Sequence, residues 1–162
     1  MKNLLLLEEF FMVTEKLNSK FDIIPLLYGS LGLELTADVE LEPQDIDVLI
    51  PLEFLNKRWA EFKKVIEELG YHLVDIREHE FCKGEYKMAF SFIEDLEEFA
   101  GINMDEIEVM TQGNARYKLL NIAQYYKVYE QSIKDGYRVN TRNKKDSEKL
   151  AIIKRILNNK GI

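Results

Sequence analysis

The chain has very little cysteine, proline and tryptophan: its 162 residues include one cysteine, three prolines and one tryptophan. Cys82 has no second cysteine to pair with, which excludes an intramolecular disulfide and fits a reducing compartment. No apolar run approaches the roughly 20 residues that span a bilayer. The Leu4–Leu7 run is interrupted by Glu8 and Glu9 before a signal-peptide core forms. We therefore expect a cytoplasmic protein without a membrane segment.

Positive charge is also in short supply. Twenty-two Lys and Arg residues face 29 Asp and Glu residues, so the net charge is −7. Binding of a nucleic acid is disfavoured, because it depends on neutralising many phosphates. A small-molecule substrate or a protein partner fits better. The length suits one well-buried core and a single domain, and leaves the oligomeric state open.

Several familiar sites are missing. His72, His79 and Cys82 lack the paired short spacing of a zinc site and a fourth ligand. The segment 28–32, Tyr-Gly-Ser-Leu-Gly, lacks both the order of a nucleophile elbow and the Gly-Lys-Ser/Thr ending of a P-loop. Zinc binding, serine hydrolysis and P-loop chemistry are therefore not expected.

Periodicity in the first half predicts alternating helices and strands. Apolar residues recur at helical spacing from Leu6 to Leu17, and a strand follows over residues 23–28. We expect a short helix over 31–36, an acidic loop over 37–44 and a strand over 45–50. An apolar stripe from Leu55 to Leu69 predicts a helix that starts near Pro51 and ends at Gly70.

The second half predicts more strands and then helices only. Strands are expected over 71–76 and 86–93, joined by a turn near Lys83-Gly84, and an extended piece over 107–110. One helix is expected from about Arg116 to Asp135 and a last one from about Lys144. This is an α+β arrangement, a mixed sheet flanked by helices. We expect residues 1–115 to form the core and residues 116–162 a helical extension packed on it.

Two short motifs carry the chemistry. Tyr28-Gly29-Ser30 ends an apolar strand where a helix begins, and such a turn offers backbone N–H groups and a hydroxyl to a phosphate. Asp45 and Asp47 lie one residue apart on the next strand, so they project from the same face. Mg²⁺ is commonly bound by one or two carboxylates together with substrate phosphates. The two motifs together predict a metal–nucleotide site.

This arrangement resembles the nucleotidyltransferase superfamily related to DNA polymerase beta, especially its small minimal and antibiotic-modifying members. The resemblance rests on Gly29, Ser30, Asp45 and Asp47, and covers residues 23–50. It implies that Asp45 and Asp47 hold Mg²⁺ and that Gly29 and Ser30 hold the phosphates of a nucleoside triphosphate, with ATP expected. It also implies transfer of a nucleoside monophosphate to a hydroxyl of a small molecule or protein.

The same resemblance implies a third carboxylate on a neighbouring strand, which binds metal or accepts a proton. Glu108 is the candidate, because its neighbours Ile107 and Val109 are apolar and would face the core. Glu106 shares its face and Asp105 is adjacent, so these alternatives stay open.

A basic group should meet the nucleotide phosphates. Lys145, beside Asp146, resembles a Lys-Asp element in the C-terminal part of some antibiotic nucleotidyltransferases, and Arg116 is an equal alternative. Asp146 is better explained as a first-turn residue of a helix capped by Asn143.

Two functions remain at this level. The first is a Mg²⁺-dependent nucleotidyltransferase. The second is a non-catalytic module of the same fold that binds nucleotide or a protein partner, a reading supported by the acidic loop and by the absence of an obvious phosphate-binding arginine. The tyrosine-rich helix near the C-terminus would supply the partner surface.

Overall fold

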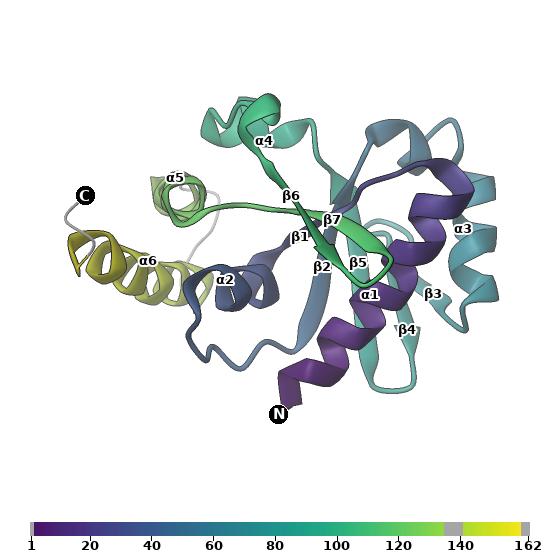
Figure 1. Ribbon diagram of the computed structural model, residues 1–162, viewed down its shortest axis with the longest axis horizontal. Coiled ribbons are helices and arrows are strands. Elements are labelled where there is room, and N and C mark those ends of the chain that lie inside the picture. Colours follow the sequence, from purple (N-terminus) through teal and green to yellow (C-terminus); the bar gives the residue numbers. More distant parts are fainter. Residues whose placement is uncertain (1, 135–140, 160–162) are drawn as a thin grey trace.

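Seven strands form one mixed sheet in the order β3-β4-β5-β2-β1-β7-β6 (Figure 1). The computed structural model describes residues 2–134 and 141–159, with the side chains of these ranges except residues 2 and 141–145. Parallel pairing joins β1 to β7 and β2 to β5, and the other neighbours are antiparallel. The strands are β1 (Leu26–Tyr28), β2 (Asp45–Ile50), β3 (His72–Asp75), β4 (Glu80–Lys83), β5 (Tyr86–Phe92), β6 (Glu108–Gln112) and β7 (Ala115–Leu119).

Helices pack on both sides of this sheet (Figure 1). Two of them cover one face, α1 (Lys2–Phe21) and α3 (Trp59–Glu68), with the 3₁₀ turn η1 (Leu52–Leu55). The opposite side carries α4 (Asp95–Ala100), the 3₁₀ turn η2 (Met104–Glu106), α5 (Ile122–Lys134) and α6 (Thr141–Asn159), with α6 packed on α5. The remaining helix, α2 (Gly29–Ala37), follows β1 directly and contributes side chains to both cores. The expected α+β fold with a mixed sheet and C-terminal helices is therefore confirmed.

The face under α1 and α3 holds the larger core. Alternate residues of the central strands point into it, because strand side chains alternate between faces. Ile46, Val48 and Ile50 of β2 lie beside Met88 and Phe90 of β5, and all five are buried. The ring of Phe62, on α3, and the ring of Phe81 each pack edge to face against Phe90.

The prediction that a helix begins at about Arg116 is wrong. Residues 115–119 form β7, in which Ala115, Tyr117 and Leu119 are buried while Arg116 is exposed. That alternation is the signature of a strand, and only from Ile122 does the chain become helical. Strand β7 pairs with β1 and so places residues 115–119 in the sheet.

Three further differences are local. The helix expected from Pro51 is split into η1 and α3, with a turn between them. Strand β4 inserts between β3 and β5, and the turn at Lys83-Gly84 joins it to β5 as expected. The short helix α4 was not expected, since six residues are too few to show a helical period.

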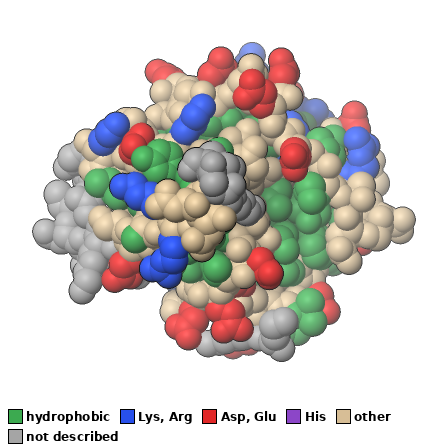
Figure 2. All heavy atoms as spheres, turned by 60° about the vertical axis from the view of Figure 1, so that its left-hand side comes forward, with side chains coloured by type: hydrophobic (Ala, Val, Ile, Leu, Met, Phe, Trp, Pro, Cys, Tyr) green, Lys and Arg blue, Asp and Glu red, His purple; other side chains and the backbone are tan. Residues whose placement is uncertain are grey.

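The surface is mixed in character. Figure 2 shows acidic side chains gathered along the upper and lower rims and a band of hydrophobic side chains right of centre. Within residues 2–134 and 141–159, no helix is both long and apolar enough to cross a membrane. The thiol of Cys82 is half-buried and free.

We expect Phe62→Ala to lower the free energy of unfolding by about 3–5 kcal/mol, because it removes a fully buried ring from the core between α3 and the sheet. Urea unfolding followed by the fluorescence of Trp59, the only tryptophan, measures this change. Phe62→Leu retains most of the volume and should lose clearly less. Equal losses for both variants would contradict this packing argument.

Candidate functional site

The turn between β1 and α2 is built on glycine. Gly29 has a φ of 64°, in the left-handed region that favours glycine. Tyr28 precedes the helix in an extended conformation and gives it no side-chain cap, so no side chain of Tyr28 occupies the first N–H groups of α2. Ser30 follows in the first turn of α2. This leaves the predicted phosphate-binding turn at a helix N-terminus.

The two aspartates lie beside this turn. The antiparallel register of β1 and β2 pairs Tyr28 with Asp47. A Cβ atom on Gly29 would overlap the Oδ2 atom of Asp47, so the carboxylate sits directly against the glycine backbone. Asp45 shares the face of Asp47 and is exposed, whereas Asp47 is half-buried. The structure therefore brings together the four residues Gly29, Ser30, Asp45 and Asp47.

Helix α5 closes the same corner through Tyr125. Asn121 and Gln124 start the helix with a reciprocal capping box, with N–H···O distances of 2.9 and 2.8 Å. Tyr125 is fully buried, and its ring stacks between Tyr28 and Tyr129 at centroid distances of 6.4 and 6.1 Å. The three rings connect the end of β1 to the C-terminal helices.

The hydroxyl of Tyr125 lies over α2. It donates a hydrogen bond to the carbonyl of Gly29 at 3.4 Å, and it would overlap a Cβ atom on Gly32. Burial raises the pKa of Tyr125 well above its ordinary value, with smaller contributions from Tyr129, Tyr28 and Asp47. The phenol is therefore neutral at physiological pH and acts as a hydrogen-bond donor beside Asp47.

Glu108 is not brought to the aspartates. It lies on β6, and β1 and β7 separate that strand from β2. Its register row runs through Leu119 and Leu27 to Val48, which points to the opposite face from Asp47. Its alternatives Asp105 and Glu106 are in η2, outside the strands. Among the described residues, no group of three or more His, Cys, Asp or Glu side chains is placed to hold a metal.

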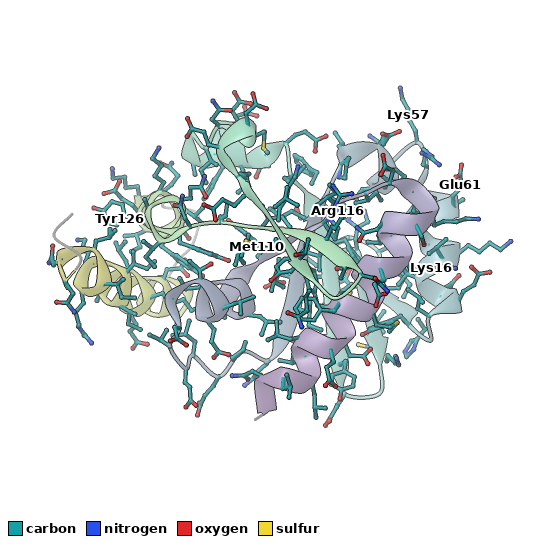
Figure 3. The ribbon with its side chains drawn as sticks, in the orientation of Figure 1. Lys16, Lys57, Glu61, Met110, Arg116 and Tyr126 are labelled. Atoms are coloured by element: carbon teal, nitrogen blue, oxygen red, sulfur yellow. The ribbon has the colours of Figure 1, made fainter. Side chains whose placement is uncertain are left out.

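The expected cations also lie elsewhere. Arg116 is held at the start of β7 by Asn18 of α1, at the end of the sheet away from Gly29 (Figure 3). The side chain of Lys145 lies outside the described residues. Asp146 is buried and accepts a hydrogen bond from Ser132, so it has a structural position between α5 and α6.

The residues next to the aspartates in the sheet belong to strand β5. In its parallel register with β2, Lys87 is beside Asp45 and Ala89 is beside Asp47. Register neighbours share a face, so Lys87, Ala89 and Ser91 border the site and none is acidic. On β4, Glu80 pairs with Ala89 and lies two strands from Asp47 on that face. The alternation of apolar and other residues over 86–92 could have shown from the sequence that Lys87, Ala89 and Ser91 share one face of a strand. We find no local sequence pattern that would have placed Tyr125 at the site.

Comparisons with known proteins give one sequence relative and one fold. No family model matches the sequence. The chain is 46% identical over 154 residues to the uncharacterized protein YnaI of Bacillus subtilis (strain 168), which covers 95% of this chain and 99% of YnaI. The structure of the present chain is similar to the crystal structure of ANT(2'')-Ia in complex with adenylyl-2''-tobramycin, with a TM-score of 0.53, 10% identity and full coverage of both chains. A solution structure of the antibiotic-resistance factor ANT(2'')-Ia gives a TM-score of 0.48 and 12% identity over 94% of this chain and 93% of that one.

At 10% identity, the likeness to the ANT(2'')-Ia crystal structure concerns the fold alone. The seven-stranded mixed sheet, its flanking helices and its C-terminal helix have a nucleotidyltransferase-like arrangement. The fold expected from the Gly29-Ser30 and Asp45–Asp47 motifs is thus the fold observed.

We expect Gly32→Ala to lower the free energy of unfolding by about 1–3 kcal/mol through overpacking. The added Cβ would overlap the Tyr125 hydroxyl and lie 2.6 Å from the carbonyl oxygen of Leu27. Thermal and urea unfolding measure the loss. The double variant Gly32→Ala/Tyr125→Phe relieves the overlap with the Tyr125 hydroxyl but not the one with the Leu27 carbonyl oxygen. It should therefore remain less stable than the wild type. Wild-type stability of the single variant would contradict the close approach.

We expect the stability of the wild type to fall more steeply above about pH 10 than that of Tyr125→Phe. The pKa of Tyr125 is raised in the folded chain, so its contribution is fully present below the unfolded-state pKa and is lost as pH rises towards the folded-state value. Urea unfolding at neutral pH and just above the unfolded-state pKa measures both slopes. Equal slopes would show that Tyr125 titrates normally.

Proposed function

The chain belongs to the same family as YnaI of Bacillus subtilis, and we propose that it is a Mg²⁺-dependent nucleotidyltransferase. It moves a nucleoside monophosphate from a nucleoside triphosphate, ATP being the expected one, to a hydroxyl group on a small molecule or a protein. The observation that carries the proposal is the position of Asp45 and Asp47 against the Gly29-Ser30 turn, in a nucleotidyltransferase-like fold.

The residues present suit a magnesium ion with bound phosphates. Asp45 and Asp47 provide two carboxylates on one face of β2, and Mg²⁺ is typically held by one or two carboxylates with phosphate oxygens completing its shell. When bound, the ion would neutralise phosphate charge and polarise the phosphoryl group. Gly29 and Ser30 would contact phosphate oxygens through backbone N–H groups and the serine hydroxyl.

The reaction balances without a covalent enzyme intermediate. The acceptor oxygen forms a bond to the α-phosphorus, the bond between that phosphorus and its bridging oxygen breaks, and pyrophosphate leaves. The acceptor hydroxyl releases its proton to solvent water or to the leaving pyrophosphate as the new bond forms. In this scheme the chain positions both substrates, which is the main source of catalysis in phosphoryl-type transfer.

One observation favours a second function, a non-catalytic nucleotide-binding module. The residues of β5 that border the aspartates are Lys87, Ala89 and Ser91, and none of them is a carboxylate or a histidine, the side chains that most often act as a general base. In such a module nucleotide would bind at the same turn without turnover. Binding and transfer must therefore be measured separately.

We expect Asp45→Asn/Asp47→Asn to lose Mg²⁺-dependent binding of ATP while the fold survives, because the two carboxylates are at the surface end of β2 rather than in the core. Calorimetric titration of ATP with and without Mg²⁺ measures binding, and pyrophosphate release measures turnover. Asp95→Asn, an exposed change on α4, is the matched control and should bind normally.

The outcomes separate the two functions. Mg²⁺-dependent binding with pyrophosphate release, both lost in the double variant, supports the transferase. Binding without release for any acceptor supports the module. Unchanged Mg²⁺-dependent binding in the double variant would refute the assignment of Asp45 and Asp47.

A further inference from the structure

In the described part of the chain, one face of the strands next to the aspartates lies outside both hydrophobic cores. On β5 the buried residues Met88 and Phe90 point towards α3, and the alternate residues point the other way. Of these, Lys87 and Ser91 are exposed and Ala89 is half-buried. The second core, under α4 and α5, includes Leu26 and Leu49 but no residue of β4 or β5. This face therefore continues directly from the aspartates.

Lys87 is the basic residue of β5 on this face. The register pairs it with Asp45 on the adjacent parallel strand, and adjacent strands are about 4.8 Å apart. Within the described part of the chain, neither Lys87 nor Asp45 takes part in an ion pair. Lys87 is thus exposed, lies on the strand beside Asp45 and forms no ion pair with these residues.

Other described lysines of the neighbourhood are engaged or lie elsewhere. Lys83 binds the Glu9 carboxylate at 3.0 Å on the α1 side. Lys149 lies over the Tyr129 ring at 5.6 Å. Lys118 pairs with Leu26 at the start of β1, away from the Gly29-Ser30 turn. Lys87 is the best-placed of these four for a ligand at the aspartates.

The balance of charge between the two carboxylates, a divalent cation and a polyphosphate gives a reason for a basic residue at position 87. Two carboxylates balance the charge of one divalent cation, so a metal-loaded Asp45–Asp47 pair would attract a polyphosphate through direct coordination by the ion and not through any net positive charge. The chain as a whole is also negative, with a net charge of −7. A fixed ammonium beside Asp45 restores local positive charge, and bonds from charged donors to phosphate are stronger than neutral ones.

We propose that Lys87 binds the phosphates of the nucleotide held at the Asp45–Asp47 pair. The inference rests on the proposed function, since it assumes a nucleotide there. It assigns the phosphate-binding cation to the strand next to the carboxylates, in place of a further acid, and it describes a site with two carboxylates and one lysine.

The test compares nucleotide affinity across matched variants. Lys87→Gln should weaken binding of Mg²⁺–ATP about tenfold, the equivalent of one charged hydrogen bond, and leave binding of adenosine unchanged. Lys87→Arg keeps the charge and should stay within about threefold of the wild type. Lys64→Gln removes an exposed charge on α3, behind the opposite face, and should bind as the wild type does. Calorimetric titration measures all four proteins, and circular dichroism checks their folds.

Salt gives a second readout, because the Lys87 contribution is electrostatic. The affinity ratio between wild type and Lys87→Gln should shrink as ionic strength rises. Equal binding by wild type and Lys87→Gln, or an equal loss in Lys64→Gln, would overturn the assignment while leaving the proposed function intact. Failure of the wild type to bind Mg²⁺–ATP would overturn both.

Discussion

The register between β1 and β2 determines the whole site. Because Tyr28 pairs with Asp47, the strand-to-helix turn begins directly beside a carboxylate, and only glycine at position 29 leaves space for it. The same register aims the N-terminus of α2 at the corner that holds Asp47, where the positive end of the helix favours an anion. A shift by one residue would turn both aspartates to the core face and would turn Ile46 and Val48 away from it.

The two faces of the sheet differ in how completely apolar side chains cover them. The face under α1 and α3 is filled by large apolar side chains and stabilises the fold. On the other face, the second core formed with α2, α4 and α5 includes Leu26 of β1 and Leu49 of β2 and, among the described residues, no residue of β4 or β5. Tyr125, a fully buried ring of this second core, donates a hydrogen bond to Gly29 at the boundary of the covered part. The site lies at this boundary, with a rigid wall on one side and solvent on the other, which suits reversible binding of a polar ligand.

The charges of the side chains around Asp45 and Asp47 determine which chemistry this fold could support. Asp45 and Asp47 are well placed for a cation, yet the adjacent strand presents Lys87 and Ala89 instead of a carboxylate. Under the proposed function, a lysine at this position would strengthen phosphate binding but could not replace a carboxylate as a metal ligand. Glu80, on the same face two strands from Asp47, is the nearest acid on β4 in register. In the proposed transferase, the acceptor proton would have to leave without a carboxylate on β5 to receive it.

Sequence alone predicted the mixed α+β fold and the elements from α1 to β2 from local periodicity, and strand alternation placed Asp45 and Asp47 on one face. It missed β4 and α4 and assigned the residues of β7 to a helix. It did not determine which strands are neighbours. Glu108 matched the local pattern of a third acid, but strand order and side-chain direction put it three strands away on the opposite face. Lys87 and Tyr125 meet the aspartates only through pairing with β2 and packing of α5, and such long-range contacts depend on the complete sheet rather than on any local run of residues.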